Sequence, residues 1–184
     1  MQITVKPNTY IFIAVLLLLV PLPWLAAWLS AIVVHEFCHW FAVQLCGGRI
    51  KRLCVGVAGA DMQSSGLSER KYLFCILCGP IGGFLPILFG VWIPRIALCS
   101  WLLSVYNLLP VLPLDGGRAL QILVNNETKF HRIETGVLVF ITICAVYAAI
   151  FLRIGVLPVC IVGILWLKNR KIPCKEGICK VQYK

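Results

Sequence analysis

The chain has 184 residues, of which 60% are hydrophobic and only 13% are charged, and its mean hydropathy is +0.92. Soluble domains are about half apolar and a quarter charged, so this composition excludes an ordinary soluble protein and predicts an integral membrane protein. The formal net charge of +10 comes from Lys and Arg residues between the apolar runs, which favours a role in membrane orientation and excludes nucleic acid as the expected partner.

The apolar runs predict an all-α polytopic membrane protein with about six transmembrane helices in a single domain over residues 1–184. The run from Tyr10 to Leu45 would be about 54 Å long as one helix, too long for one crossing of a core about 30 Å thick, and Pro21 and Pro23 divide it. We expect its first part to be retained as a span and not cleaved as a signal peptide. The expected spans are 8–22, 24–46, 72–91, 92–112, 135–152 and 154–168, followed by a basic cytosolic tail over 169–184.

The longest interruption, residues 49–71, is partly alternating and contains glycine. This pattern predicts a short membrane-associated β-hairpin over residues 53–62, with an ordinary connecting loop as the alternative. We hypothesise that the hairpin offers an edge strand to an unwound peptide.

The distribution of basic residues predicts the orientation. If six spans alternate and the N-terminus is cytosolic, fifteen of the 17 Lys and Arg lie inside, and only Arg95 and Arg153 lie outside. This bias predicts a multi-pass protein of the cell membrane, surrounded by lipid, with both termini in the cytosol.

The second expected span contains His35-Glu36-Phe37-Cys38-His39. On a helix, residues i and i+4 share a face, so both imidazoles can bind one metal ion, as in zinc hydrolases. A chance match is the alternative. Three ionisable groups within five residues of a membrane helix cost a few kcal/mol each on insertion scales, and a divalent cation would compensate for that cost.

Asp115 is the expected third ligand, because the fourth span brings it towards the same leaflet as the second span. Asp-Gly-Gly is also ordinary turn chemistry, so a turn residue is the alternative. We place Glu134 at a span boundary and interpret His131 as a solvated loop histidine. The ten cysteines are expected to be mostly small buried residues, and a metal or redox role for Cys75-x-x-Cys78 is the minor alternative.

Three motifs together resemble the site-2 proteases, a family of intramembrane zinc metalloproteases: H-E-F-C-H, C-G-P-I-G-G at residues 78–83, and N-L-L-P-V-L-P-L-D-G-G-R at residues 107–118. The six-span form without soluble appendages resembles the bacterial sporulation-type enzyme that processes a membrane-tethered sigma-factor precursor. Relatives often carry alanine where Cys78 stands and asparagine where Gly83 stands, so these two positions depart from the family pattern.

The resemblance implies one Zn²⁺ per chain held by His35, His39 and Asp115, with Glu36 as general base. We expect Asn107 to contact the substrate or to pack a helix. The expected activity is cleavage of a membrane-embedded or membrane-tethered protein near the cytosolic face, which could release a transcription factor and be restrained by a regulatory membrane protein. The alternatives are a metal or proton transporter, disfavoured because the outer halves of the spans lack ionisable groups, and a non-catalytic scaffold stabilised by zinc.

Overall fold

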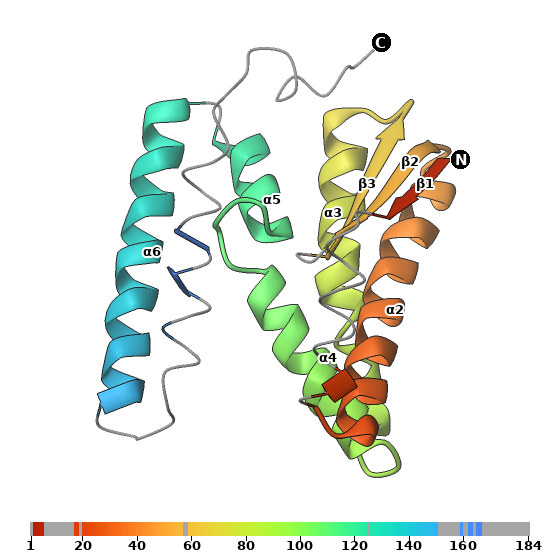
Figure 1. Cartoon of the computed structure of the whole chain (residues 1–184). Coiled ribbons are helices and arrows are strands. Elements are labelled where there is room, and N and C mark those ends of the chain that lie inside the picture. Colours follow the sequence, from red (N-terminus) through yellow and green to blue (C-terminus); the bar gives the residue numbers. More distant parts are fainter. Residues whose placement is uncertain are drawn as a thin grey trace. The chain divides into compact units, whose positions relative to one another are not determined.

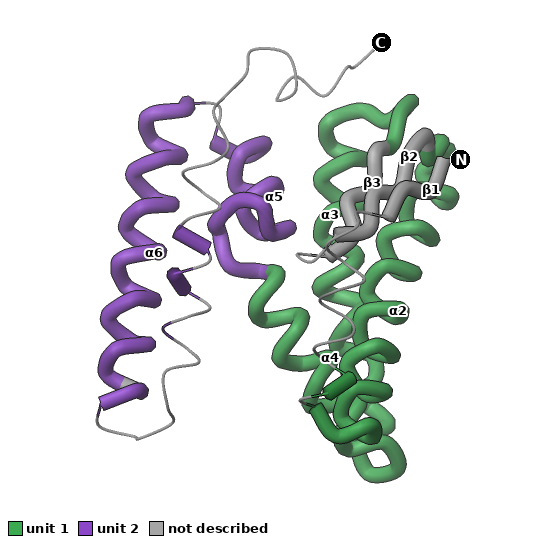
Figure 2. The backbone as a smooth tube through the Cα atoms, in the orientation of Figure 1, with its two compact units in different colours: residues 1–107, 182–184 green, residues 108–181 purple. Residues whose placement is uncertain are grey.

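The computed structural model describes residues 2–5, 17–18, 20–56, 59–124, 126–150, 159, 162–163 and 165–166. Its backbone divides into two compact units, residues 1–107 with 182–184 and residues 108–181, coloured separately in Figure 2. Most of the spans predicted over 8–22 and 154–168, and all of the tail over 169–184, lie outside the described residues. The single-domain organisation stays a prediction.

The described part of unit 1 contains a long helix, a small sheet, two shorter α-helices and a 3₁₀ helix (Figure 1). In chain order they are β1 (Gln2–Val5), α2 (Leu22–Leu45), β2 (Arg49–Gly56), β3 (Gly59–Ser65), α3 (Glu69–Gly82), the 3₁₀ helix η1 (Leu85–Phe89) and α4 (Pro94–Asn107). Helix α2 packs against both α3 and α4. Alanines make these approaches possible: Ala42 lies in the cluster with Cys75 of α3, and Ala27 and Ala31 pack on Cys99 of α4.

Helix α2 confirms the helix predicted over 24–46, and its ends have the expected causes. It begins directly after Pro21, with Pro23 in its first turn, where a missing N–H costs nothing. It ends before Gly47, whose φ of 76° is in the left-handed region that glycine adopts without strain. The N–H of Gly48 then bonds to the carbonyl of Val43 at 2.9 Å.

The predicted hairpin is present as an antiparallel pair, β2 and β3, and it is longer than expected. Its register aligns Leu53 with Met62 and Val55 with Ala60. The sequence did not predict β1, which pairs in parallel with β2, so the sheet has the order β1-β2-β3. Association of the sheet with a membrane stays a prediction.

Unit 2 contains α5 (Asp115–Leu123) and α6 (Glu127–Ile150). Helix α6 starts eight residues before the expected start of the span at 135, because Asn126 caps it: its Oδ1 accepts the N–H of Lys129 at 3.1 Å. Residues 127–134, which lie before the expected span, are therefore the first part of a helix.

Three helical segments of the described residues are long and apolar enough to cross a membrane: Leu22–Leu45, Glu69–Phe89 and Glu127–Tyr147. Helix α4 has 14 residues and is about 21 Å long, shorter than a bilayer core, so the span expected over 92–112 is not one continuous helix. It ends at Asn107 because two prolines follow, at positions 110 and 113. The described helices support three of the six predicted spans.

Candidate metal centre

His35 and His39 lie on one face of α2, one turn apart. Their Nε2 atoms are 3.2 Å from each other, and the ring planes are nearly perpendicular, at 86°. Two nitrogens that bind one tetrahedral zinc ion at about 2.0–2.1 Å lie about 3.3 Å apart. The imidazoles are therefore already spaced for a shared metal ion.

A backbone contact fixes the tautomer of His39. Its Nδ1 lies 2.8 Å from the carbonyl oxygen of Cys75 on α3. A carbonyl only accepts hydrogen bonds, so Nδ1 carries the proton and donates it, and Nε2 keeps its lone pair. That lone pair can accept a hydrogen bond from His35 or bind a metal ion, and the carbonyl orients the ring as outer contacts of metal ligands typically do.

Glycine on α3 makes room for this imidazole. A Cβ at Gly79 would collide with Nε2 and Cε1 of His39, and a Cβ at Gly82 would collide with the Cys38 side chain. The motif C-G-P-I-G-G is therefore a site of close helix packing, and its Gly79 lies beside a candidate ligand.

The two imidazoles are shielded from solvent to different degrees, and α2 also carries a carboxylate next to them in sequence. His35 is only 4% exposed and His39 is half-buried, as is Glu36, the residue after His35 and about 100° further around the helix. An imidazole pair of this geometry fits a divalent cation, whose charge would offset the cost of desolvating a nearby carboxylate.

Asp115 is the first residue of α5 in unit 2 and is half-buried. Asp115 therefore begins a helix of its own after α4, and a negative charge at a helix N-terminus interacts favourably with the helix dipole. A carboxylate, like the imidazoles of His35 and His39, is a donor type that zinc and other divalent cations bind.

The two glycines after Asp115 are required by close backbone packing. A Cβ at Gly116 would collide with the carbonyl of Leu108, and a Cβ at Gly117 would collide with the backbone of Val111. The first turn of α5 is therefore packed against the segment that precedes it.

Asn107 is the last residue of α4, and its Nδ2 donates to the carbonyl of Leu103 in the same helix at 3.1 Å. This bond lies within α4 and gives the Asn107 side-chain amide a partner. A substrate contact by Asn107 stays a prediction.

Sequence reasoning did not reveal three features: the hydrogen bond of His39 to the carbonyl of Cys75, the space at Gly79, and the burial of Glu134. Glu134 is only 1% exposed and is not at a helix boundary, and His131, interpreted as a solvated loop histidine, contacts it on α6. Residues 127–133 of the same helix already contain four ionisable side chains, so no local pattern singled out Glu134.

No protein-family profile matches the sequence, and no characterised protein is significantly similar to it in sequence. The fold is similar to a solved structure of the site-2 protease from Methanocaldococcus jannaschii. The TM-score is 0.62 over 97% of this chain and 95% of the other, with 15% sequence identity. The chain therefore shares the fold of a site-2 protease, and its composition and apolar helices are those of a membrane protein.

Proposed function

We propose that the chain is an intramembrane zinc metalloprotease that hydrolyses a peptide bond of a membrane-embedded or membrane-tethered protein near the cytosolic face. The observation that carries this proposal is the His35–His39 pair, with Nε2 atoms 3.2 Å apart on a helix long and apolar enough to cross a bilayer. The fold shared with a site-2 protease supports the same activity.

The proposed ligands of one Zn²⁺ per chain are His35, His39 and Asp115. Three protein ligands leave one position open, as catalytic zinc sites do. Zinc bound there would lower the pKa of a water molecule towards neutrality and polarise the scissile carbonyl.

Glu36 is the proposed general base. It follows His35 directly, and it takes the proton of the attacking water and later delivers it to the leaving amine. A structural zinc site needs no such base, so Glu36 favours an enzyme over a scaffold. For Asn107 to bind a substrate carbonyl, its Nδ2 would exchange the carbonyl of Leu103 for that of the substrate.

The β-sheet is the proposed docking site for the unwound substrate. A transmembrane helix hides its carbonyls in its own hydrogen bonds, so the cleaved segment must unwind first. Among the strands of the described residues, β3 pairs with β2 alone, so we infer that its other edge can pair with an extended peptide.

The proposed setting is a bacterial cell membrane, with six spans and both termini in the cytosol. The cleaved protein would be membrane-anchored, such as the precursor of a transcription factor in a sporulation-type pathway, and a regulatory membrane protein would restrain the enzyme.

Co-expression with candidate single-span or hairpin-anchored proteins tests the activity. We compare wild type with Glu36→Gln, which removes the base and none of the proposed ligands, and with Glu69→Gln, which changes an exposed carboxylate at the start of α3. We expect zinc in all three proteins, wild-type cleavage by Glu69→Gln, and a loss of about 10²–10⁴-fold in Glu36→Gln. Equal cleavage by Glu36→Gln would exclude this chain as the protease.

A further inference from the structure

Glu134 is a buried carboxylate that the proposed chemistry does not use. It lies within the apolar segment Glu127–Tyr147 and is 1% exposed. A carboxyl group in such a place costs several kcal/mol unless its oxygens have partners. Its contacts therefore indicate why it is there.

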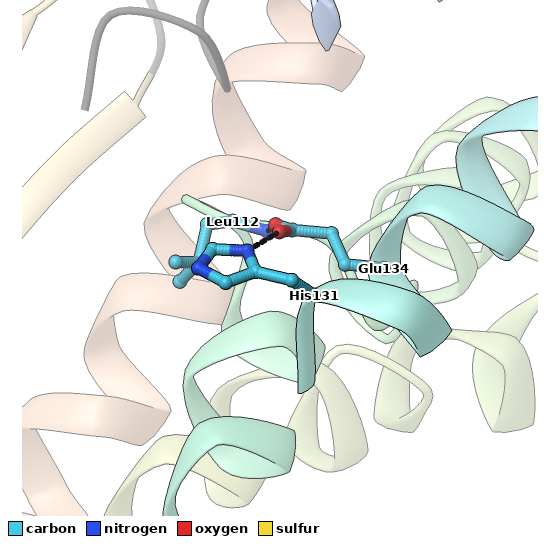
Figure 3. Close-up of polar contacts among 3 residues, drawn as sticks. All are labelled: Leu112, His131 and Glu134. Carbon is cyan, nitrogen blue, oxygen red and sulfur yellow. Dashed lines mark hydrogen bonds and ion pairs between the residues drawn. The ribbon is translucent and has the colours of Figure 1, made fainter. Parts of the chain in front are cut away.

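Each oxygen of Glu134 has a partner within unit 2 (Figure 3). Oε1 accepts the backbone N–H of Leu112 at 2.9 Å, and Oε2 lies 3.3 Å from Nδ1 of His131, one turn earlier on α6. The His131 side chain is 58% exposed, so the pair extends from the buried carboxylate to the helix surface.

Leu112 belongs to the turn, residues 108–114, that leads into α5. Pro110 and Pro113 have no N–H, so few backbone donors are available to hold this turn. The N–H of Val111 bonds to Leu109, and the N–H of Leu114 bonds to Val111. The N–H of Leu112 is instead paired with α6, so this bond ties the turn to another helix.

The turn over residues 108–114 and the first turn of α5 are in close backbone contact. The glycines after Asp115 pack on the carbonyl of Leu108 and on Val111, and the N–H of Arg118 bonds to the carbonyl of Leu114 at 3.0 Å. The bond that fixes Leu112 therefore also fixes the start of α5, and Asp115 lies there, three residues further along the chain.

We propose that Glu134 is a positioning residue for the metal centre, which fixes the turn that presents Asp115 by accepting the Leu112 N–H. This inference rests on the proposed role of Asp115 as a ligand. Outer contacts of metal ligands typically contribute 10–100-fold in metal affinity.

Three variants of the full-length protein separate the hydrogen bond from simple stability. Glu134→Gln keeps an oxygen that can accept the Leu112 N–H. Glu134→Leu removes this acceptor and replaces the side chain with an apolar one of similar size. Thr142→Val is the matched control, because Thr142 also makes side-chain hydrogen bonds from α6, to the carbonyl of Leu138 and from Trp166 Nε1, but it does not contact the turn.

The first measurement is zinc affinity by chelator competition, together with the absorption spectrum of the Co²⁺-substituted protein. We expect Glu134→Leu to bind zinc at least tenfold more weakly than wild type and to have an altered Co²⁺ spectrum. The zinc affinities of Glu134→Gln and Thr142→Val should stay within threefold of wild type. Wild-type affinity in Glu134→Leu, or an equal loss in Glu134→Gln, would overturn the proposal.

The second measurement is amide hydrogen exchange in metal-free wild-type protein, which decides the question even if Glu134→Leu does not fold. We expect the Leu112 amide to be protected like the amides of α5, and unprotected exchange at Leu112 would also overturn the proposal. Wild-type protein that binds no metal would instead contradict the proposed protease function itself, so the two failures are distinguishable.

Discussion

At the scale of single residues, the candidate centre depends on how His39 is held. One ring nitrogen donates to the carbonyl of Cys75, the other lies 3.2 Å from Nε2 of His35, and Gly79 leaves space for the ring. The histidine spacing follows from helix periodicity and was readable in the sequence. The backbone carbonyl and the glycine contact were not, because they depend on the approach of a second helix.

The contact at Gly79 gives a prediction. Gly79→Ala places a methyl group against the His39 imidazole, so the ring must move or α2 and α3 must separate, at a cost of about 1–3 kcal/mol. We expect zinc affinity and cleavage to fall at least tenfold.

Gly136→Ala is the control, since a Cβ there meets nothing within 4 Å and alanine favours a helix. It should retain zinc binding and activity and be equally or more stable. If Gly79→Ala binds zinc as tightly as wild type, His39 is not held in the way described here.

At the scale of elements, the sequence predicted helix α2 and the β2–β3 pair well and predicted other boundaries less well. Prolines and glycines mark the ends of α2, and these are local signals. The pairing of β1 with β2 joins residues about fifty positions apart, which no local pattern reveals. Helix α6 starts earlier than predicted because Asn126 caps it. The sequence did not indicate this start, because the cap lies in a polar segment.

The sheet gives a prediction at this scale. Successive residues of an edge strand direct their N–H groups alternately towards the neighbouring strand and away from it. Of Asp61→Pro and Met62→Pro, both in β3, one therefore breaks the pairing with β2 and the other removes a donor at the open edge. We expect the variant that breaks the pairing with β2 to have lower thermal stability. We expect the variant that changes the open edge to fold normally but to cleave the substrate at least tenfold more slowly.

Met62→Leu is the control for this pair and should cleave like wild type. Two well-folded proline variants with wild-type cleavage would exclude peptide docking on β3. Val55 is unsuitable for this test because it lies in the central strand β2.

At the scale of the whole molecule, composition and charge predicted a membrane protein, and the comparison of folds agrees with this over nearly the full chain. Three segments of the described residues are long and apolar enough to cross a membrane, and the site-2 protease fold is shared at only 15% identity, so the resemblance seen in the sequence rested on three short motifs and not on overall similarity. The candidate ligands were readable because ionisable residues are rare in apolar runs. Their supporting residues, Glu134 and Gly79, were not, because their roles arise from packing.

The central claim is that this membrane protein holds a zinc ion through two imidazoles and one carboxylate. Cysteines offer the competing ligands, since Cys38, Cys75 and Cys78 lie on the same two helices as the histidine pair and its carbonyl contact. X-ray absorption at the zinc edge of the purified protein distinguishes the two ligand sets, because zinc–sulfur bonds are about 2.3 Å and zinc–nitrogen and zinc–oxygen bonds about 2.0–2.2 Å. We predict one zinc per chain with only nitrogen and oxygen neighbours, and a sulfur shell or the absence of stoichiometric zinc would contradict the account.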